Sequence, residues 1–584
     1  MNRKRRRAGT LAGAACLLLA AMMLADCGSA GYSNSGNPGN SGVSVTLKPG
    51  SATVAEGGQQ QFSATVTGSS NTAVTWYATG GTISASGLYT AGNATGNFTV
   101  SATSMADSSK PGQAAVTVTA NAPPPSPPGT ANSITKDGIT WTFSQAVPVG
   151  QFVNGDYYVV GPVTIAAIDP APTTSSPYLN GSVKNLPTAN QKSGFDSRLN
   201  DGSDQSWWFD ATLRSYPPIS LKPGDALVSS ISLATIHSDV EVMRASDMSA
   251  SPVKTVSVLT VVSAAPSADA FRPSYCDRGQ AMYHANSLQR NLLPSLAQPN
   301  PGNTPPISQF ETWYRRPWID TSPFLFDAPA DYMPSYGQHV AFADSYAALL
   351  LELDFPADQK VNLTNYFVQY GIDLYGCLNA GVGWPAFGGH RSGRKLPIVF
   401  AGILLNNDGM KNVSANHPNQ FGEDMQTVDV NLIPPAGTYQ QAWQGAKVIY
   451  GGHYGVTTNG TPVSAGLYGP YEQLQPSSWP LINGNEQLGE AYRRCCTSVA
   501  WVGEALAIRI LKAQNVWNYQ PFFDYVDRWM KEDDTAAVAA IKAQTGFDYS
   551  ANWERQGQTR FWLQGEFPQY TFIDDMWTAY RPTN

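Results

Sequence analysis

The pattern of hydrophobic and polar positions divides the chain into a strand-rich N-terminal part and a helical C-terminal part. From 43 to 120, short alternating runs such as VSVTLKP, QQFSATVTG and NFTVSAT are separated by turn residues. Successive side chains of a strand point to opposite faces, so this alternation predicts half-buried strands and a small β-sandwich. The segment has no cysteine, and we expect its core to depend on Phe62, Trp76 and Phe98.

A second β-rich region is predicted from 131 to 267, where runs such as GITWTFSQAV, DYYVVGPVTIAAI and TVSVLTVVS occur. Its length favours a larger, β-sandwich-like domain. The stretch NAPPPSPPGT, residues 121–130, precedes it. Because prolines stiffen the backbone, we expect a linker and a domain boundary there. Trp207 and Trp208 offer aromatic surface for a sugar, although strand alternation favours one of them in the core.

Helical spacing of apolar residues dominates from 268 to 584. We expect helices within the segments 279–293, 340–353, 360–378, 396–407, 486–513 and 534–544. Long loops rich in glycine and aromatic residues separate several of them, notably 376–393 and 408–487. Helices that carry such loops suit an all-α incomplete (α/α) toroid, in which the loops build a catalytic cleft at one end. An irregular helical bundle fits the pattern nearly as well.

Residues 1–27 have the pattern of an export signal. The basic MNRKRRR precedes the apolar LAGAACLLLAAMMLA, which is too short to span a membrane. The following LADC resembles the cleavage box of bacterial lipoproteins, which implies a lipid anchor on Cys27. Asp26 departs from that pattern, so two expectations stay open: a lipoprotein at the outer membrane, cell surface or periplasm, or a secreted chain. Residues 28–42, rich in Gly, Ser and Asn, predict a flexible tether.

The chain contains few charged residues. Of its 584 residues 14% are charged and 42% are hydrophobic, and the formal net charge is -7. This acidic balance argues against a nucleic-acid partner, and the apolar content argues against disorder. It also makes any local cluster of basic residues more noticeable.

Four cysteines belong to the expected exported body: Cys276, Cys377, Cys495 and Cys496. Export permits disulfides, whereas no Cys or His spacing suggests a metal site, and we expect neither a metal nor a cofactor. Side chains of adjacent residues diverge in a helix. We therefore expect Cys495 and Cys496 to pack, or one of them to bridge elsewhere, without redox chemistry.

The densest basic cluster is GGHRSGRK, residues 388–395, directly ahead of an apolar helical run and in the same loop as Trp384. Glycines permit close approach of a ligand, and the N-terminus of the following helix carries partial positive charge. The guanidinium groups of Arg391 and Arg394 suit a uronic acid, because two N–H groups of one arginine pair with both carboxylate oxygens. A solvated surface cluster is the alternative.

A second cluster, YGGHYG at 450–455, lies in a long loop that continues to LYGPYEQ. His453, Tyr454 and Tyr468 put groups capable of acid and base chemistry on flexible backbone. An ordinary tyrosine has a pKa of about 10, so it serves as a base only where nearby cations favour the phenolate. The basic loop would supply that field if the two loops meet. Packing and hydrogen bonding by the tyrosines is the alternative.

Two further places carry candidate residues. SYGQHVAFADSY puts Gln338 and His339 at the entrance of a predicted helix, where we expect them to face the same mouth. A helix cap or a satisfied core histidine is the alternative. Arg493 precedes the apolar face of the helix predicted at 486–513 and is a candidate to point into the cleft.

Two parts of the sequence resemble known families. SATVAEGGQQQFSATV and AVTWYATGGTISASGLYTA, within 43–120, resemble the group 2 bacterial immunoglobulin-like domain, which implies a spacer or adhesion module. SYGQHVAFADSYAALLLEL, GGHRSGRKLPIVFAG, FGEDMQT and EAYRRCCTSVAWVGEALA resemble segments of exported bacterial proteins related to (α/α)-toroid polysaccharide lyases of alginate or glucuronan. The second resemblance covers most of 131–584. It implies β-elimination, in which a Tyr or His removes the C5 proton of a uronate while polar and cationic groups neutralise its carboxylate.

On that pattern the catalytic candidates are His390, Tyr454, His453, Arg394 and His339. The substrate-binding candidates are Arg391, Lys395, Gln338, Trp384, Tyr468 and Arg493. We therefore expect an exported, metal-independent polysaccharide lyase whose partner is an acidic polysaccharide.

Two alternatives stay open. A glycoside hydrolase would use two carboxylates on either side of a sugar, for which the long loops offer Glu423, Asp424, Glu472 and Glu486. A non-catalytic surface protein that binds carbohydrate or mediates adhesion would use the Ig-like domain and the tether, but it leaves the His, Arg and Tyr cluster unexplained.

Overall fold

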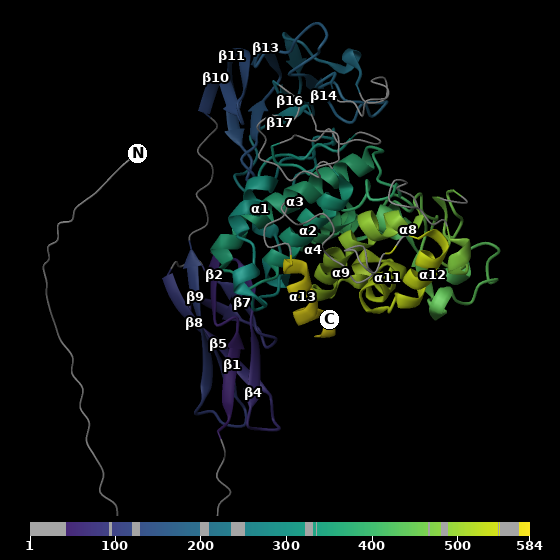
Figure 1. Cartoon of the computed structure of the whole chain (residues 1–584). Coiled ribbons are helices and arrows are strands. Elements are labelled where there is room, and N and C mark those ends of the chain that lie inside the picture. The colour runs from purple at the N-terminus through teal and green to yellow at the C-terminus, as the bar shows by residue number, and fades with distance from the viewer. Residues whose placement is uncertain are drawn as a thin grey trace, which may run out of the picture.

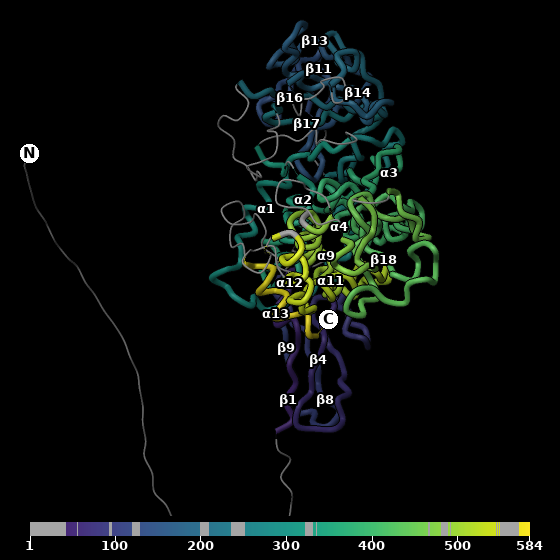
Figure 2. The backbone as a smooth tube through the Cα atoms, turned by 45° about the vertical axis from the view of Figure 1, so that its right-hand side comes forward, coloured from purple at the N-terminus to yellow at the C-terminus, as the bar shows by residue number. Residues whose placement is uncertain are grey.

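The computed structural model describes residues 42–55, 57–92, 96–119, 129–198, 209–234, 252–321, 331–334, 336–464, 468–479, 489–546, 548 and 571–583. Figure 1 shows the strands of residues 44–119 at one end of the molecule, the helices in the middle and the strands of residues 129–262 at the other end. The turned view of Figure 2 keeps this arrangement, so the two β-rich parts flank the helical body. The predicted export signal and tether, Trp207, Trp208 and Glu486 lie outside the described residues.

The first part is a β-sandwich of short strands, as the alternation predicts. Its strands are β1 (Ser44–Lys48), β2 (Ser51–Ala55), β3 (Gln59–Gln61), β4 (Ser63–Thr67), β5 (Val74–Ala78), β6 (Gly81–Ile83), β7 (Leu88–Ala91), β8 (Gly96–Ser104) and β9 (Pro111–Thr119). They form a sheet in the order β2-β9-β8-β5, a second in the order β3-β7-β6, and the pair β1-β4. Phe62 is fully buried between them, while Trp76 and Phe98 pack partly buried against that core.

The second part forms one eight-stranded sheet. Its strands are β10 (Gly129–Lys136), β11 (Ile139–Gln151), β12 (Tyr157–Val160), β13 (Val163–Asp169), β14 (Ser182–Lys184), β15 (Ile219–Leu221), β16 (Ala226–Ser232) and β17 (Val253–Val262). The long β11 pairs with β13 near its start and with β12 near its end, so the sheet folds around one core. Across that core the indole Nε1 of Trp141 donates to Ser229 Oγ at 2.9 Å.

The third part is helical. Its helices are α1 (Ile307–Tyr314), α2 (Gly337–Leu351), α3 (Ala357–Asn379), α4 (Lys395–Leu404), α5 (Asp408–Lys411), α6 (Val413–Asn416), α7 (Gly422–Met425), α8 (Gly489–Tyr492), α9 (Trp501–Ile510), α10 (Gln514–Trp517), α11 (Gln520–Lys531), α12 (Thr535–Thr545) and α13 (Phe572–Tyr580). Every residue of α2 is buried, and α2 packs against α3, α4 and α9. A helix with no polar face is expected at the centre of a core.

Most of the predicted helical segments contain α-helix, but 279–293 does not. It has only two 3-10 turns, Ala285–Ser287 and Arg290–Leu292. The reason is local pairing: the amide of Phe271 donates to Tyr283 O, and the amide of Ala285 donates to Asp269 O, both at 2.8 Å. These backbone groups therefore form hydrogen bonds to another segment instead of hydrogen bonds within a helix. The prediction of a helix at this place was wrong.

The cysteines also depart from expectation. Cys276 is bonded to Cys377 on α3, and Cys495 is bonded to its neighbour Cys496. The second bond corrects the expectation that adjacent side chains diverge, because the backbone there is not α-helical. A π-helical turn, Arg493–Thr497, and a 3-10 turn, Ser498–Ala500, separate α8 from α9.

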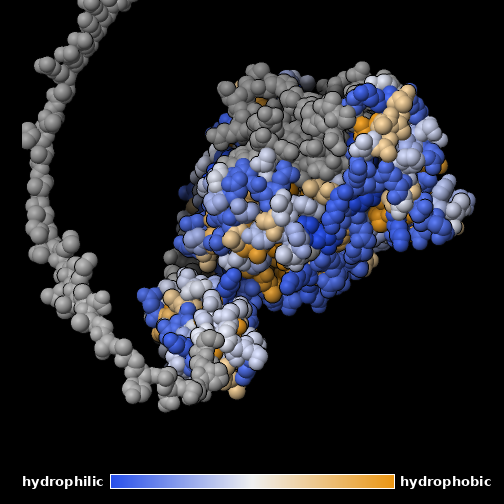
Figure 3. All heavy atoms as spheres, turned by 60° about the horizontal axis from the view of Figure 1, so that its bottom comes forward, coloured by the Kyte–Doolittle hydropathy of each residue, from blue (hydrophilic) through white to orange (hydrophobic). Residues whose placement is uncertain are grey.

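Figure 3 shows one face of the molecule, on which hydrophilic residues predominate and hydrophobic residues lie in small groups. Scattered apolar residues of this kind are ordinary on a protein surface and do not mark a docking site. In the part of the chain that the structure describes, no helix has both the length and the apolar character to cross a bilayer.

Candidate active site

The basic loop and the loop 450–455 lie against each other, which answers the question that the sequence left open. The amide of Gly388 donates to the carbonyl oxygen of His453 at 2.8 Å. A Cβ on Gly388 would lie 2.2 Å from Cε1 of Tyr492 and 2.7 Å from Cε1 of His453, and the residue has a positive φ of 50°. Glycine is therefore required here for both the backbone conformation and the close approach.

The two loops and the ends of two helices bring together a set of imidazole and aromatic rings, which we call the His–Tyr cluster: Tyr336, Phe387, His390, His453, Tyr454, Tyr468 and Tyr492. His453 is central. Its ring centroid lies 4.8 Å from that of Tyr492, 4.9 Å from that of Tyr454 and 5.2 Å from that of Phe387.

The members of the cluster differ in exposure. Tyr336, His453 and Tyr492 are buried, whereas the others are partly exposed: Phe387, His390, Tyr454 and Tyr468. His390 stands edge-on to Tyr336, with ring centroids 4.8 Å apart. The partly exposed side of the cluster therefore carries one imidazole and three aromatic rings.

Both imidazoles of the cluster are neutral at neutral pH. Burial first, and then the nearby His453, Arg391 and Arg394, lower the pKa of His390 to about 3. Burial alone lowers the pKa of His453 to about 4. A neutral imidazole carries one N–H donor and one acceptor nitrogen, so each ring is able to take a proton from a bound molecule.

Tyr454 does not have the properties of a base. Burial, and then Tyr468, raise the pKa of its hydroxyl above the ordinary value of 10.0. No cation of the neighbouring loop lowers this pKa, although the two loops meet as required. Tyr454 therefore keeps its proton at neutral pH, and its hydroxyl is suited to donating a proton.

Two of the predicted cations are neutralised by the protein itself. Nε of Arg394 lies 2.7 Å from Asp320 Oδ2, and Nζ of Lys395 lies 2.5 Å from Asp424 Oδ2. Lys395 is fully buried and also lies 4.3 Å from the ring centroid of Trp517. The sequence shows the cations but not their partners, which lie 74 and 29 positions away. These internal ion pairs give no support to Arg394 as a catalytic group or to Lys395 as a substrate ligand.

Arg391 differs from these two cations. In the described segments no carboxylate forms an ion pair with it, and its Nη1 donates to the backbone oxygen of Gly383 at 3.3 Å. The pKa of Arg391 is lowered to about 10, mainly by burial, with Asp320 opposing this effect and Arg394 adding to it, so Arg391 still carries its charge at neutral pH. A buried cation without its own carboxylate favours the binding of an anion.

Three other predicted residues lie behind the cluster instead of at its mouth. Gln338 and His339 at the start of α2 are fully buried. Gln338 Nε2 donates to the carbonyl oxygen of Cys495 at 2.7 Å, and burial lowers the pKa of His339 to about 4. Trp384 is fully buried, and its amide donates to Gln420 O. All three are fully buried, so the structure gives no support to His339 as a catalytic group or to Gln338 and Trp384 as substrate contacts.

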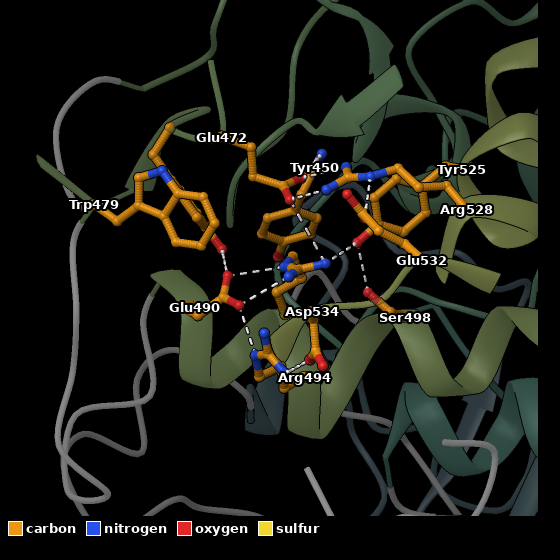
Figure 4. Close-up of polar contacts among 12 residues, drawn as sticks. Tyr450, Glu472, Trp479, Glu490, Arg494, Ser498, Tyr525, Arg528, Glu532 and Asp534 are labelled. Carbon is orange, nitrogen blue, oxygen red and sulfur yellow. Dashed lines mark hydrogen bonds and ion pairs between the residues drawn. The ribbon is translucent and has the colours of Figure 1, made fainter. Parts of the chain in front are cut away.

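Arg493 also belongs to the interior. Figure 4 shows Glu490 and Arg494 within a polar network. Arg493 Nη2 and Arg494 Nε both lie close to Glu490 Oε1, at 2.8 and 2.6 Å. Burial alone would raise the pKa of Glu490, but Arg493 and Arg494 hold it at about 2. Glu472 joins the same network through Arg493, at 3.7 Å, and also pairs with Arg528, at 2.6 Å. Arg493 is thus a structural ion-pair residue and not a ligand for substrate.

The carboxylates considered for a hydrolase are also used internally. Glu423 and Glu472 are fully buried, and Asp424 binds Lys395 and the indole of Trp517. Burial raises the pKa of Glu423 to about 7. Among the described residues no group of three or more His, Cys, Asp or Glu side chains is arranged to hold a metal ion.

A pocket of about 340 Å³ lies elsewhere, beside the Cys276–Cys377 disulfide, and none of the cluster residues lines it. Its walls include Asp277, Tyr283 and Tyr375. The guanidinium of Arg278, also in its wall, is already held by backbone carbonyls of Gly224 and Leu186.

Sequence reasoning missed Tyr336 and gave no role to Tyr492. Their phenol oxygens share a hydrogen bond of 2.5 Å. Tyr336 stands two positions before Gln338 in the stretch SYGQHV, and Tyr492 stands beside Arg493. Both stretches attracted attention through other residues, so a search for phenols next to the candidates would have found them.

The chain has no match among the curated proteins with which it was compared. The elements of the fold and one family match show that the chain combines several domains, with an Ig-like β-sandwich first and a helical region last. Residues 43–112 match the family of the bacterial Ig-like domain (group 2).

Proposed function

We propose that the protein is an exported polysaccharide lyase that cleaves an acidic, uronate-containing polysaccharide such as alginate or glucuronan by β-elimination. The observation that carries the proposal is the composition of the His–Tyr cluster. Two neutral imidazoles and four phenols converge from separate segments, one cation without a carboxylate partner in the described chain lies in the same loop, and no carboxylate belongs to the cluster.

In this mechanism the imidazole of His390 takes the C5 proton of a uronate. The electron pair of the C5–H bond forms the C4–C5 double bond, and the bond between C4 and its glycosidic oxygen breaks. Tyr454 gives its proton to the departing oxygen, since its raised pKa keeps that proton in place. The rings of both residues lie beside Phe387, with centroids 5.2 and 5.4 Å away. Proton transfers by positioned side chains contribute roughly 100- to 10,000-fold each.

Arg391 supports the first step by binding the uronate carboxylate. Removal of a proton next to a carboxylate builds up negative charge, so a cation fixed there lowers the barrier. The bound anion also acts on the base. Burial is the main cause of the low pKa of His390, but Arg391 adds to it, and a carboxylate at Arg391 would oppose that addition. A carboxylate bound at Arg391 therefore favours transfer of a proton to His390.

The remaining parts of the chain fit this proposal. Partly exposed Tyr454 and Tyr468, with ring centroids 5.2 Å apart, offer faces on which a sugar ring stacks. The Ig-like sandwich and the predicted tether would hold the enzyme away from the cell surface, with Cys27 as the candidate lipid anchor. Assignment of the helices to an incomplete (α/α) toroid belongs to the same proposal and is supported by the helix pairs α1–α3, α3–α4 and α2–α9.

The experiment uses the purified chain with alginate, glucuronan and a neutral glucan. Ultraviolet absorbance reports unsaturated uronate ends, and a second assay reports reducing ends. The proposal expects both signals to rise together with a uronate polymer and neither with the glucan. Reducing ends without absorbance would identify a hydrolase, and retention on the polymer without either signal would identify a binding protein; both results contradict the proposal.

A further inference from the structure

The disulfide between Cys495 and Cys496 lies next to the His–Tyr cluster. Tyr492, the residue at the end of α8, stands three positions before Cys495, and the π-helical turn that starts at Arg493 contains both cysteines. Such turns are rare and occur frequently at functional sites. The disulfide closes a small ring with the peptide bond between the two residues, so it restricts the backbone at this turn.

The restricted turn contacts two of the segments that form the cluster. The carbonyl oxygen of Cys495 accepts a hydrogen bond of 2.7 Å from Gln338 Nε2 at the start of α2. The carbonyl oxygen of Cys496 lies against the basic loop, because a Cβ on Gly389 would be 2.3 Å from it. Both contacts use backbone oxygens, whose directions depend on the conformation of the turn.

The same turn fixes Tyr492 itself. Its phenol shares the hydrogen bond with Tyr336, and its ring lies 4.8 Å from that of His453. A change from π-helical to α-helical geometry removes one residue from the bulge and rotates α8 relative to the helical turns on the other side of the bulge. Tyr492 and the carbonyl of Cys496 would then no longer fit their present neighbours at the same time.

We infer that the Cys495–Cys496 disulfide is a positioning element of the active site, and that its reduction by a dithiol switches the enzyme off. This inference rests on the proposed function for its activity readout. The reaction balances: a dithiol gives up two electrons and two protons, becomes a cyclic disulfide, and leaves two cysteine thiols.

Exposure makes this bond the more accessible of the two described disulfides. Cys495 is partly exposed, whereas Cys276 and Cys377 are both buried. Thiol–disulfide exchange requires access to a sulfur atom, so a dithiol should reduce the Cys495–Cys496 bond first. Mild treatment therefore tests this bond while the other remains closed.

The test compares the full chain before and after mild treatment with dithiothreitol, with peptide mass analysis to show which cysteines have become thiols. Kinetics on a uronate polymer should show a loss of roughly 10- to 100-fold in kcat with little change in KM, because displacement of catalytic groups by about 1 Å costs this much. Reoxidation should restore the rate. The control is the double variant Cys495→Ser/Cys496→Ser, which should start at the reduced level and not respond to dithiothreitol.

A second readout does not depend on activity. Hydrogen exchange of the peptides that contain Gly388 and His453 should accelerate on reduction of the wild-type chain and should already be fast in the double variant, while peptides of the Ig-like domain stay unchanged. If the chain cleaves no polymer, the proposed function fails, but this exchange result still tests the positioning role. Unchanged exchange and unchanged kcat after reduction, a fully active double variant, or free thiols at both cysteines in the untreated chain would each overturn the inference.

Discussion

The phenol oxygens of Tyr336 and Tyr492 lie 2.5 Å apart and share a hydrogen bond, although 156 positions separate the two residues. Tyr336 stands at the N-cap of α2 and supports the ring of His390, while Tyr492 ends α8 and supports the ring of His453. One hydrogen bond thus joins the supports of the two imidazoles behind the exposed face of the cluster.

Tyr492→Phe should remove this bond and leave the hydroxyl of Tyr336 without that partner. A buried hydroxyl that loses its partner costs roughly 1–3 kcal/mol, so the free energy of unfolding should fall by about that amount. Denaturant titration measures this loss, and kcat on a uronate polymer should fall with it. A variant as stable and as active as the wild type would show that the hydrogen bond has no positioning role.

Tyr454→Phe should lower kcat by roughly 100-fold with little change in KM, because the ring remains while the proton donor is lost. Tyr468→Phe is the matched control. Its ring lies beside that of Tyr454 with similar exposure, and the mechanism gives its hydroxyl no proton to transfer. Equal losses in the two variants would contradict the assignment of Tyr454 as the acid.

Substitutions of Arg391 and Arg394 should have different effects, the first on substrate binding and the second on the stability of the fold. Arg391→Gln removes a cation with no carboxylate partner in the described chain, so KM for a uronate polymer should rise roughly tenfold or more and stability should change little. Arg394→Gln instead removes the ion pair with the buried Asp320. The loss of one partner of a buried pair costs about 3–5 kcal/mol. Steady-state kinetics and denaturant titration on both variants check this. A raised KM for Arg394→Gln together with a loss of stability for Arg391→Gln would show that Arg394 is the substrate ligand.

The network of Figure 4 should make stability depend on acid pH. The pKa of Glu490 is about 2 when folded and 4.5 in its ordinary state, so its contribution is complete above pH 4.5 and is lost as pH falls toward 2. Glu490→Gln should cost about 3–5 kcal/mol at pH 7 and flatten this acid dependence. Glu532→Gln, which removes a less buried pair with Arg528, should cost less than Glu490→Gln. Similar losses in both variants at pH 7 would contradict the account.

The two imidazoles of the cluster should not titrate near the ordinary value of 6.5. Burial lowers the pKa of His390 to about 3 and that of His453 to about 4. Between these values and pH 6.5 the unfolded chain binds more protons than the folded one, so both groups should reduce stability as pH falls below 6.5. NMR of the imidazole resonances from pH 7.5 to 4.5 checks this. A midpoint near 6.5 for either ring would show that it is solvated.

The spacing of apolar residues predicted strands and helices well where burial of those residues is the main interaction. Alternation around Phe62 identified the Ig-like strands, and the apolar run after Lys395 identified α4. The helix predicted at 279–293 failed because the carbonyl oxygen of Tyr283 and the amide of Ala285 pair with residues 269–271, a contact that helical spacing does not reveal.

The site shows the same limit. The sequence brought His390, His453 and Tyr454 to attention because of their unusual surroundings of glycine and charge. It did not show that Asp320 and Asp424 neutralise Arg394 and Lys395, because these pairings are set by the tertiary fold. The pairing of Glu490 with Arg493 and Arg494 was within reach, since residues three and four positions apart meet on a helix.

The most direct test of the proposed chemistry is the rate at which wild-type protein and His390→Gln form unsaturated uronate ends from the same polymer under identical conditions. Removal of the proton acceptor predicts a rate at least about 100-fold lower for the variant, with an unchanged unfolding midpoint. Equal rates for the two proteins would contradict the role of His390 and with it the proposed mechanism.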